Sequence, residues 1–171
     1  ADAQTGGPCR LSQDVPRRRV PAQPQTIAGC RALSGFLLDT NVVSAFRRPD
    51  RAPHVVRWLA DKPDNSLYLS VVTLGEIERG IAQQTQRDPS FAQDLRSWLD
   101  RTMLLFADRI LPFDADAARI WGRLSARIGN AGADLQIAAT AISRDGTVVT
   151  GDRAFLATGA RVVSPFPEPL L

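Results

Sequence analysis

The sequence has 171 residues, of which 44% are apolar, and this is enough for one ordinary domain with a hydrophobic core. No apolar run approaches the roughly 18 to 20 residues that a membrane-spanning helix requires, so the composition argues against an integral membrane protein. The formal net charge of +3 arises entirely within residues 1–35, because residues 36–171 hold equal numbers of acidic and basic side chains. A uniformly basic surface for nucleic acid is therefore excluded for the main body of the chain.

The first 35 residues are rich in Pro, Gly, Gln and Arg and show no apolar periodicity. Such a segment buries too little apolar surface to offset the entropy lost on ordering, so we expect a disordered N-terminal extension before one folded domain over residues 36–171. A basic arm that contacts nucleic acid or a partner is the alternative. Arg17, Arg18 and Arg19 are not followed by an apolar segment, so we expect no secretory signal and a cytoplasmic protein.

The few cysteine and histidine residues restrict the chemistry of any site. Both cysteines, Cys9 and Cys30, precede the expected domain, so its fold depends on neither a disulfide nor a thiolate site. His54 is the only histidine, which excludes a zinc site built from several histidines. We expect His54 to be an exposed residue in the first turn of a helix.

From residue 36 onward, short apolar runs alternate with segments of helical periodicity. The expected strands cover residues 36–41, 67–72, 110–113, 147–150 and 161–163, and the expected helices cover residues 42–46, 54–62, 73–84, 89–107, 114–128 and 134–144. This alternation predicts an α/β fold with a mostly parallel sheet of four to five strands flanked by helices. We expect the chain from Pro165 onward to be a tail.

Four acids share one kind of position, at a strand end or in the first turns of the helix that follows a strand. They are Asp39, Glu76, Asp134 and Asp152. In a doubly wound sheet the carboxyl ends of parallel strands meet along one edge, so these carboxylates are expected to converge there. Like charges in one cleft repel unless cations offset them, and Mg²⁺ or Mn²⁺ suits a site that offers only oxygen ligands.

Each of these acids also has a purely structural interpretation, which the sequence leaves open. Asp39 fits a cap for the next helix, and Asp152 fits an ordinary turn residue. Thr73 and Glu76 match the spacing of a capping box, in which the glutamate side chain bonds back to a backbone N–H. Asp134 fits the first turn of a helix, where the helix dipole favours negative charge.

Four segments together resemble the motifs of PIN-domain ribonucleases, most closely the toxin branch of VapC and FitB type. They are Phe36-Leu37-Leu38-Asp39-Thr40-Asn41, the stretch from Leu69 to Ile77, the stretch from Asp134 to Ala141, and Val149-Thr150-Gly151-Asp152-Arg153-Ala154-Phe155. The resemblance implies a Rossmann-like three-layer fold. It also implies a metal-dependent endoribonuclease that acts as the toxin of a type II toxin–antitoxin pair.

Carried over to this sequence, the resemblance implies that the four acids hold one or two Mg²⁺ or Mn²⁺ ions and catalyse hydrolysis of RNA. Thr40, Asn41 and Thr150 would be supporting donors beside these acids, with capping of helices and turns as their alternative role. Asp116 is either an extra acid near the site or a helix cap. The implied partners are the RNA substrate, a cognate antitoxin and a second copy of the chain, with no membrane.

One departure from the family pattern and two other functions remain to be weighed. The last motif often carries a further acid near Phe155, whereas Arg153 and Ala154 precede it here, so a second metal ion would be held weakly. The first alternative is a non-catalytic PIN-like binding module. The second is a phosphohydrolase with Asp39 as nucleophile, although Asn41 stands where that class has its second acid.

Overall fold

The structure is a computed structural model that describes residue 33 and residues 35–167. The prediction of a disordered extension falls on residues 1–35 and therefore lies almost entirely outside the described residues. Within the described part of the chain, no helix is long and apolar enough to cross a membrane.

A five-stranded sheet forms the centre of the domain. Its strands are β1 (Phe36–Leu38), β2 (Leu67–Ser70), β3 (Ile110–Leu111), β4 (Thr147–Val149) and β5 (Arg161–Val163). The spatial order is β3-β2-β1-β4-β5, and each neighbouring pair is parallel. These strands confirm the predicted α/β fold with a parallel sheet.

Helices fill the connections between the strands. They are α1 (Thr40–Phe46), α2 (Pro53–Ala60), α3 (Val71–Thr85), α4 (Pro89–Leu105), α5 (Ala115–Ile128) and α6 (Ala133–Ser143), with 3₁₀ turns η1 (Asp64–Ser66) and η2 (Arg153–Thr158). Helices α1 and α3 begin two residues earlier than predicted. The reason is that Asp39 and Ser70, directly after or at the end of a strand, cap these helices with their side chains and so turn the chain at once.

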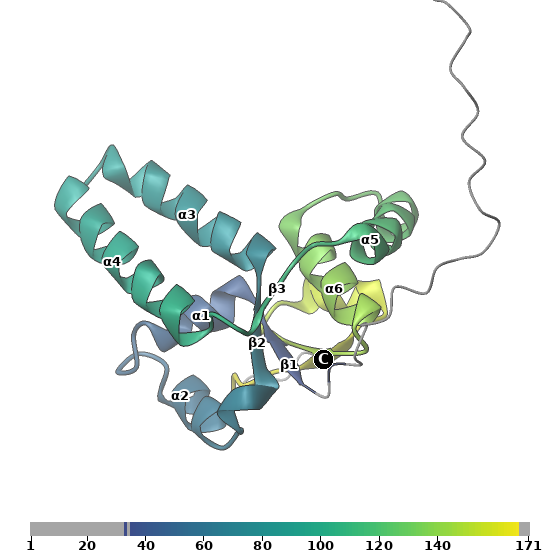
Figure 1. Cartoon of the computed structure of the whole chain (residues 1–171), viewed down its shortest axis with the longest axis horizontal. Helices are drawn as coiled ribbons and strands as arrows, with labels where there is room; N and C mark the ends of the chain where they lie inside the picture. Colours follow the sequence, from purple (N-terminus) through teal and green to yellow (C-terminus); the bar gives the residue numbers. More distant parts are fainter. Residues whose placement is uncertain (1–32, 34, 168–171) are drawn as a thin grey trace, which may run out of the picture.

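The alternating side chains of the strands face two separate hydrophobic cores. In β1, Leu38 joins the core formed with α1 to α4, and Leu37 joins the core formed with α6 and Phe155. Figure 1 shows the same division, with the antiparallel pair α3 and α4 on one side of the strands and α5 and α6 on the other. Both faces of the sheet are therefore covered, which explains why its strands are mostly apolar.

The order of the strands places a topological switch point between β1 and β4. From β1 the chain adds β2 and β3 on one side, then crosses to the other side of β1 to add β4 and β5. Connections that leave two neighbouring strands in opposite directions open a crevice at their carboxyl ends, where α/β proteins bind ligands. The residues that follow Leu38 and Val149 lie at that crevice.

The C-terminal segment is not the free tail that we expected from Pro165 onward. Pro165 is buried, and the ring of Phe166 packs edge-on against the ring of His54, with the two ring centres 5.5 Å apart. The apolar ring offsets the entropy of ordering this segment by covering the junction between α2 and the end of β4.

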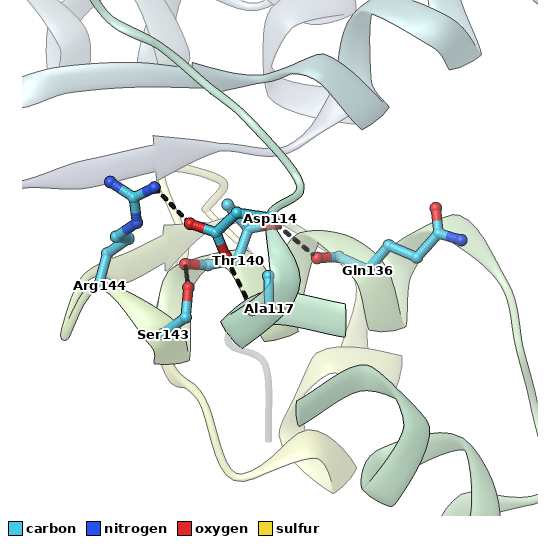
Figure 2. A network of polar contacts seen from close by, with 6 residues as sticks. All are labelled: Asp114, Ala117, Gln136, Thr140, Ser143 and Arg144. Carbon is cyan, nitrogen blue, oxygen red and sulfur yellow. Dashed lines mark hydrogen bonds and ion pairs between the residues drawn. The ribbon is translucent and has the colours of Figure 1, made fainter. Parts of the chain in front are cut away.

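Helices α5 and α6 are joined by a polar network that includes the acid capping α5 (Figure 2). The carboxylate of Asp114 accepts hydrogen bonds from the backbone N–H of Ala117 at 3.0 Å and from the guanidinium of Arg144 at 2.7 Å. The Ala117 amide, and after it Arg144, lower the pKa of Asp114. Asp116 is exposed in the first turn of the same helix, so the capping role considered for Asp116 belongs to Asp114.

Replacing Asp114 by Ala should lower the free energy of unfolding by about 1 to 2 kcal/mol at pH 7, because α5 loses its cap and Arg144 loses its partner. Asp116→Ala is the matched control and should change it by less than about 0.5 kcal/mol. Urea denaturation followed by circular dichroism measures both. Equal effects of the two substitutions would contradict the assignment of the cap.

Candidate active site

Asp39 lies at the carboxyl end of β1, in the crevice beside β4. Its backbone N–H donates to the carbonyl of Val149 at 3.0 Å, so the ladder between the two strands continues up to the aspartate. The residue is only 3% exposed. One carboxylate oxygen accepts from the backbone N–H of Thr40 and the other from the hydroxyl of Thr150, each at 2.7 Å. Asp39 is thus both the cap of α1 and a buried carboxylate at the switch point.

The hydroxyl of Thr150 connects the ends of β1 and β4. It donates to Asp39, and its oxygen accepts from the side-chain amide of Asn41 at 3.0 Å and from the backbone N–H of Asp152 at 2.9 Å. The side-chain oxygen of Asn41 in turn accepts from the N–H of Gly151 at 3.4 Å. These bonds use the full hydrogen-bonding capacity of one buried hydroxyl, so the turn after β4 is tied to the start of α1.

Glu76 reaches the site from the second turn of α3. Its carboxylate accepts a hydrogen bond from the hydroxyl of Thr40 at 2.5 Å. Helix α3 is capped by Ser70, and the hydroxyl of Thr73 donates to the carbonyl of Leu38 at 3.5 Å. The capping box considered for Thr73 and Glu76 is therefore wrong, because the helix begins before Thr73 and Glu76 faces α1.

Asp134 and Asp152 complete the acidic group from the other side of the switch point. Asp134 is half-buried at the second position of α6, and Asp152 caps η2 by accepting from the N–H of Ala154 at 2.8 Å. Burial, followed by the charges of Asp152 and Glu76, raises the pKa of Asp134. The predicted positions, a helix start for Asp134 and a turn for Asp152, are thus correct. In these positions the acids still interact electrostatically with one another.

The pKa of Asp39 reflects its burial first and the neighbouring acids second. Burial raises it from 3.8 to about 6; the hydrogen bonds from Thr150 and Thr40 oppose this shift, and the charges of Asp134 and Glu76 add to it. Since charge effects of this kind fall with distance, the structure brings all four acids predicted from the sequence into one neighbourhood. Their role as ligands stays a prediction.

None of these four acids forms an ion pair with an arginine or lysine among the residues that the structure describes. Acids elsewhere do: Asp114 pairs with Arg144 at 2.7 Å, and Asp145 pairs with Arg161 at 2.8 Å. Within the described residues, the acids of the site therefore have no ion-pair partner, whereas acids elsewhere do.

Comparison with known proteins shows which family has this arrangement. Residues 36–160, which contain all four acids, match the PIN domain family. The chain belongs to the PIN domain family. The match begins at β1 and includes the whole of the switch point, so the resemblance seen in the four motifs is confirmed.

Similar PIN domain proteins include relatives of known name and solved structure. The chain is 35% identical over 144 residues to the VapC ribonuclease Y4jK of Sinorhizobium fredii, covering 78% of this chain and 99% of Y4jK. It is 36% identical over 140 residues to the toxin FitB of Neisseria gonorrhoeae, covering 78% of this chain and 99% of FitB. The crystal structure of FitAcB from Neisseria gonorrhoeae has a TM-score of 0.67 at 36% identity and covers 76% of this chain and 97% of that chain.

The donor atoms of this PIN domain fit a hard divalent cation. The four acids and the neighbouring Thr40, Asn41 and Thr150 offer only oxygen ligands, the type that Mg²⁺ and Mn²⁺ prefer. Burial raises the pKa values of Asp39 and Asp134, and repulsion from the neighbouring acids adds to both shifts. A bound cation would relieve that repulsion. As the side chains stand, no three Asp, Glu, His or Cys residues in the described chain are placed to share one ion. The fit to a cation therefore rests on the type of the donor atoms and not on a preformed cluster of ligands.

Arginines line a cavity beside the acids of the PIN domain. The cavity has a volume of about 720 Å³, adjoins Glu76, and is lined by Arg47, Arg48 and Arg51 at the end of α1 and just after it. The guanidinium of Arg47 lies 4.9 Å from the ring centre of Phe91, which favours a fixed orientation. The net charge of the domain is zero, so the overall charge did not point to these arginines. Their close spacing directly after the first acidic motif is the sequence signal that could have identified them.

A second cavity of about 670 Å³ lies on the Asp152 side of the site and is lined by Gly151, Asp152 and Arg153. Asn41, His54 and Phe166 line both cavities. His54 is half-buried and not exposed as predicted, because Phe166 packs against its ring.

The apolar residues of α1 and α2 differ in how accessible they are to a partner. Val55 is fully buried in the core, and the ring of Trp58 packs edge-on against Phe36 with ring centres 5.2 Å apart. Phe46 is 42% exposed and so remains accessible to a partner.

Asp116 is not among the residues whose charge raises the pKa of Asp39 or Asp134.

The raised pKa of Asp39 predicts how stability depends on pH in the metal-free protein. Between pH 3.8 and about 6 the folded state binds this proton more tightly than the unfolded state, so stability should fall as the pH rises through that window. At pH 7.5 in EDTA, Asp39→Asn should therefore raise the free energy of unfolding, by at most about 3 kcal/mol. Urea denaturation at several pH values measures this. Asp100→Asn, which changes an exposed acid on α4, is the control, and an equal gain for both variants would refute the explanation.

Proposed function

We propose that this PIN domain protein is a Mg²⁺- or Mn²⁺-dependent endoribonuclease and the toxin of a type II toxin–antitoxin pair. The observation that carries the proposal is the group of four acids at the switch point, which has no ion-pair partner within the described residues. Burial, and after it the charges of the neighbouring acids, raises the pKa values of Asp39 and Asp134. The names of its relatives, a VapC ribonuclease and the toxin FitB, support RNA as substrate and toxin as role.

In this proposal Asp39, Glu76, Asp134 and Asp152 bind one or two ions. A bound Mg²⁺ or Mn²⁺ ion supplies a Lewis acid that polarises the phosphate and acidifies the attacking water. Thr150 and the Thr40 amide keep both oxygens of Asp39 in a fixed orientation. The Thr40 hydroxyl likewise holds the carboxylate of Glu76 by a hydrogen bond.

The arginine-lined cavity accounts for how a neutral domain holds a polyanion. Arg47, Arg48 and Arg51 on one side and Arg153 on the other lie in the two cavities that flank the acids. Guanidinium groups bind phosphate with two hydrogen bonds and a full charge. Phosphates on either side of the scissile bond therefore find positive charge, while the scissile phosphate lies at the acids.

Two other functions are less well supported. A PIN-like module without catalysis requires no acidic group, yet all four acids are retained and repel one another electrostatically. A phosphohydrolase with Asp39 as nucleophile has a second acid two residues later, and Asn41 occupies that position here. Trapping of a phosphoaspartate at Asp39 would revive the second alternative, and a folded protein that fails to bind Mn²⁺ would revive the first.

The partners follow from the same proposal. An antitoxin encoded beside the toxin would block the acidic site, and both proteins would act in the cytoplasm, where the RNA is. Leu104 and Leu105 at the end of α4 are 78% and 59% exposed, which offers apolar surface to a second copy of the chain. Sedimentation equilibrium tests the homodimer, and a monomer at micromolar concentration would exclude it.

Cleavage of an RNA pool should be abolished by EDTA and restored by excess Mn²⁺. Asp39→Asn and Asp134→Asn should each lower the rate at least about 100-fold, the effect expected when a group that acts in the transition state is removed. Mapping of cleaved RNA ends measures this. Asp116→Asn is the matched control and should cleave at the normal rate, whereas normal cleavage by either site variant would refute the assignment.

A further inference from the structure

The segment after β5 folds back over the end of β4. The carbonyl of Val163, the last residue of β5, accepts from the N–H of Thr150 at 3.0 Å. Beyond it, Pro165 is buried and the N–H of Phe166 donates to the hydroxyl of Ser164 at 3.1 Å, which turns the chain. Phe166 is thereby brought to the acidic site, although it lies beyond residue 160, where the match to the family ends.

The ring of Phe166 lies directly on Gly151. A Cβ atom at position 151 would stand only 2.7 Å from Cδ2 of this ring, closer than real Cβ contacts come. Gly151 does not have a positive φ, so its backbone conformation does not require glycine. The ring therefore leaves no room for a side chain at position 151, between Thr150 and Asp152.

Helix α2 packs against the other side of the Phe166 ring. Phe166 packs edge-on against His54, and the next residue of the helix, Val55, is fully buried in the core. The Nε2 atom of His54 is buried without a hydrogen-bond partner among the described residues, so this imidazole acts as a packing surface. The ring is thus held between a fixed helix and the turn that carries Asp152.

We infer that Phe166 is a positioning residue for Asp152, the acid that the proposed function places at the metal. Hydrogen bonds connect the turn to Asn41 and Thr150, but Gly151 and Asp152 are themselves exposed. The ring of Phe166 packs against the turn at Gly151, so that the carboxylate of Asp152 stays within reach of Asp134. Without the ring, the turn keeps its hydrogen bonds but gains freedom to move away from the other acids.

Calorimetric titration with Mn²⁺ tests this inference in the full-length protein. Phe166→Ala should weaken Mn²⁺ binding about tenfold, within the range known for residues that support metal ligands, and Phe166→Leu should weaken it less. Phe91→Ala is the matched control, because Phe91 is also half-buried and lines the same cavity but lies on α4. It should lose thermal stability and keep the Mn²⁺ affinity of the wild type.

Two further measurements distinguish positioning from general destabilisation. Gly151→Ala should weaken Mn²⁺ binding much less in the Phe166→Ala background than alone, because the clash disappears with the ring; additive effects would contradict the contact. In the metal-free protein, ¹⁵N relaxation should show lower order parameters at Gly151 and Asp152 in Phe166→Ala but not in Phe91→Ala.

The outcomes separate this inference from the proposed function. Wild-type affinity for Mn²⁺ together with unchanged order parameters in Phe166→Ala would overturn the positioning role. If the wild type itself binds no Mn²⁺, the metal-dependent function fails, and the order parameters alone decide whether Phe166 holds the turn.

Discussion

A single buried carboxylate determines how the rest of the site is built. Asp39 lies where β1 and β4 diverge, and both its oxygens accept hydrogen bonds from neighbouring residues. Burial alone would favour the protonated acid, so the Thr150 hydroxyl and the Thr40 amide are needed to keep its orientation when it is charged. Because these donors come from the ends of two strands, the position of the carboxylate depends on the pairing of β1 with β4.

The distribution of charge follows from that arrangement. Acids far from the crevice, such as Asp114 and Asp145, form ion pairs with arginines, and other arginines line the cavity beside the acidic site. The acids in the crevice are left to repel one another, at a cost in stability that a cation would offset. In the proposed function such a site would separate two tasks: the arginines of the cavity walls would hold the polyanion, and the acids would bind the metal ion.

The sequence was a good guide where position along the chain decides position in space. Strand ends in a parallel sheet share one edge, so the alternation of strands and helices was enough to bring Asp39, Asp134 and Asp152 together. It failed where two local explanations competed. The spacing of Thr73 and Glu76 is that of a capping box, yet Ser70 caps the helix and Glu76 bonds to Thr40 of another helix. Such a contact between distant segments has no local signature.

The amino-acid sequence by itself determined the parallel α/β fold, the family and the four acids, because apolar periodicity and motif order are local properties of the chain. Only the tertiary structure decided that the basic residues Arg47 and Arg51 face the site in a neutral domain, and that Phe166 covers Gly151 at the end of β4. The physical reason is that cavities, ring contacts and burial arise from packing between segments far apart in sequence, which no spacing along one segment can specify.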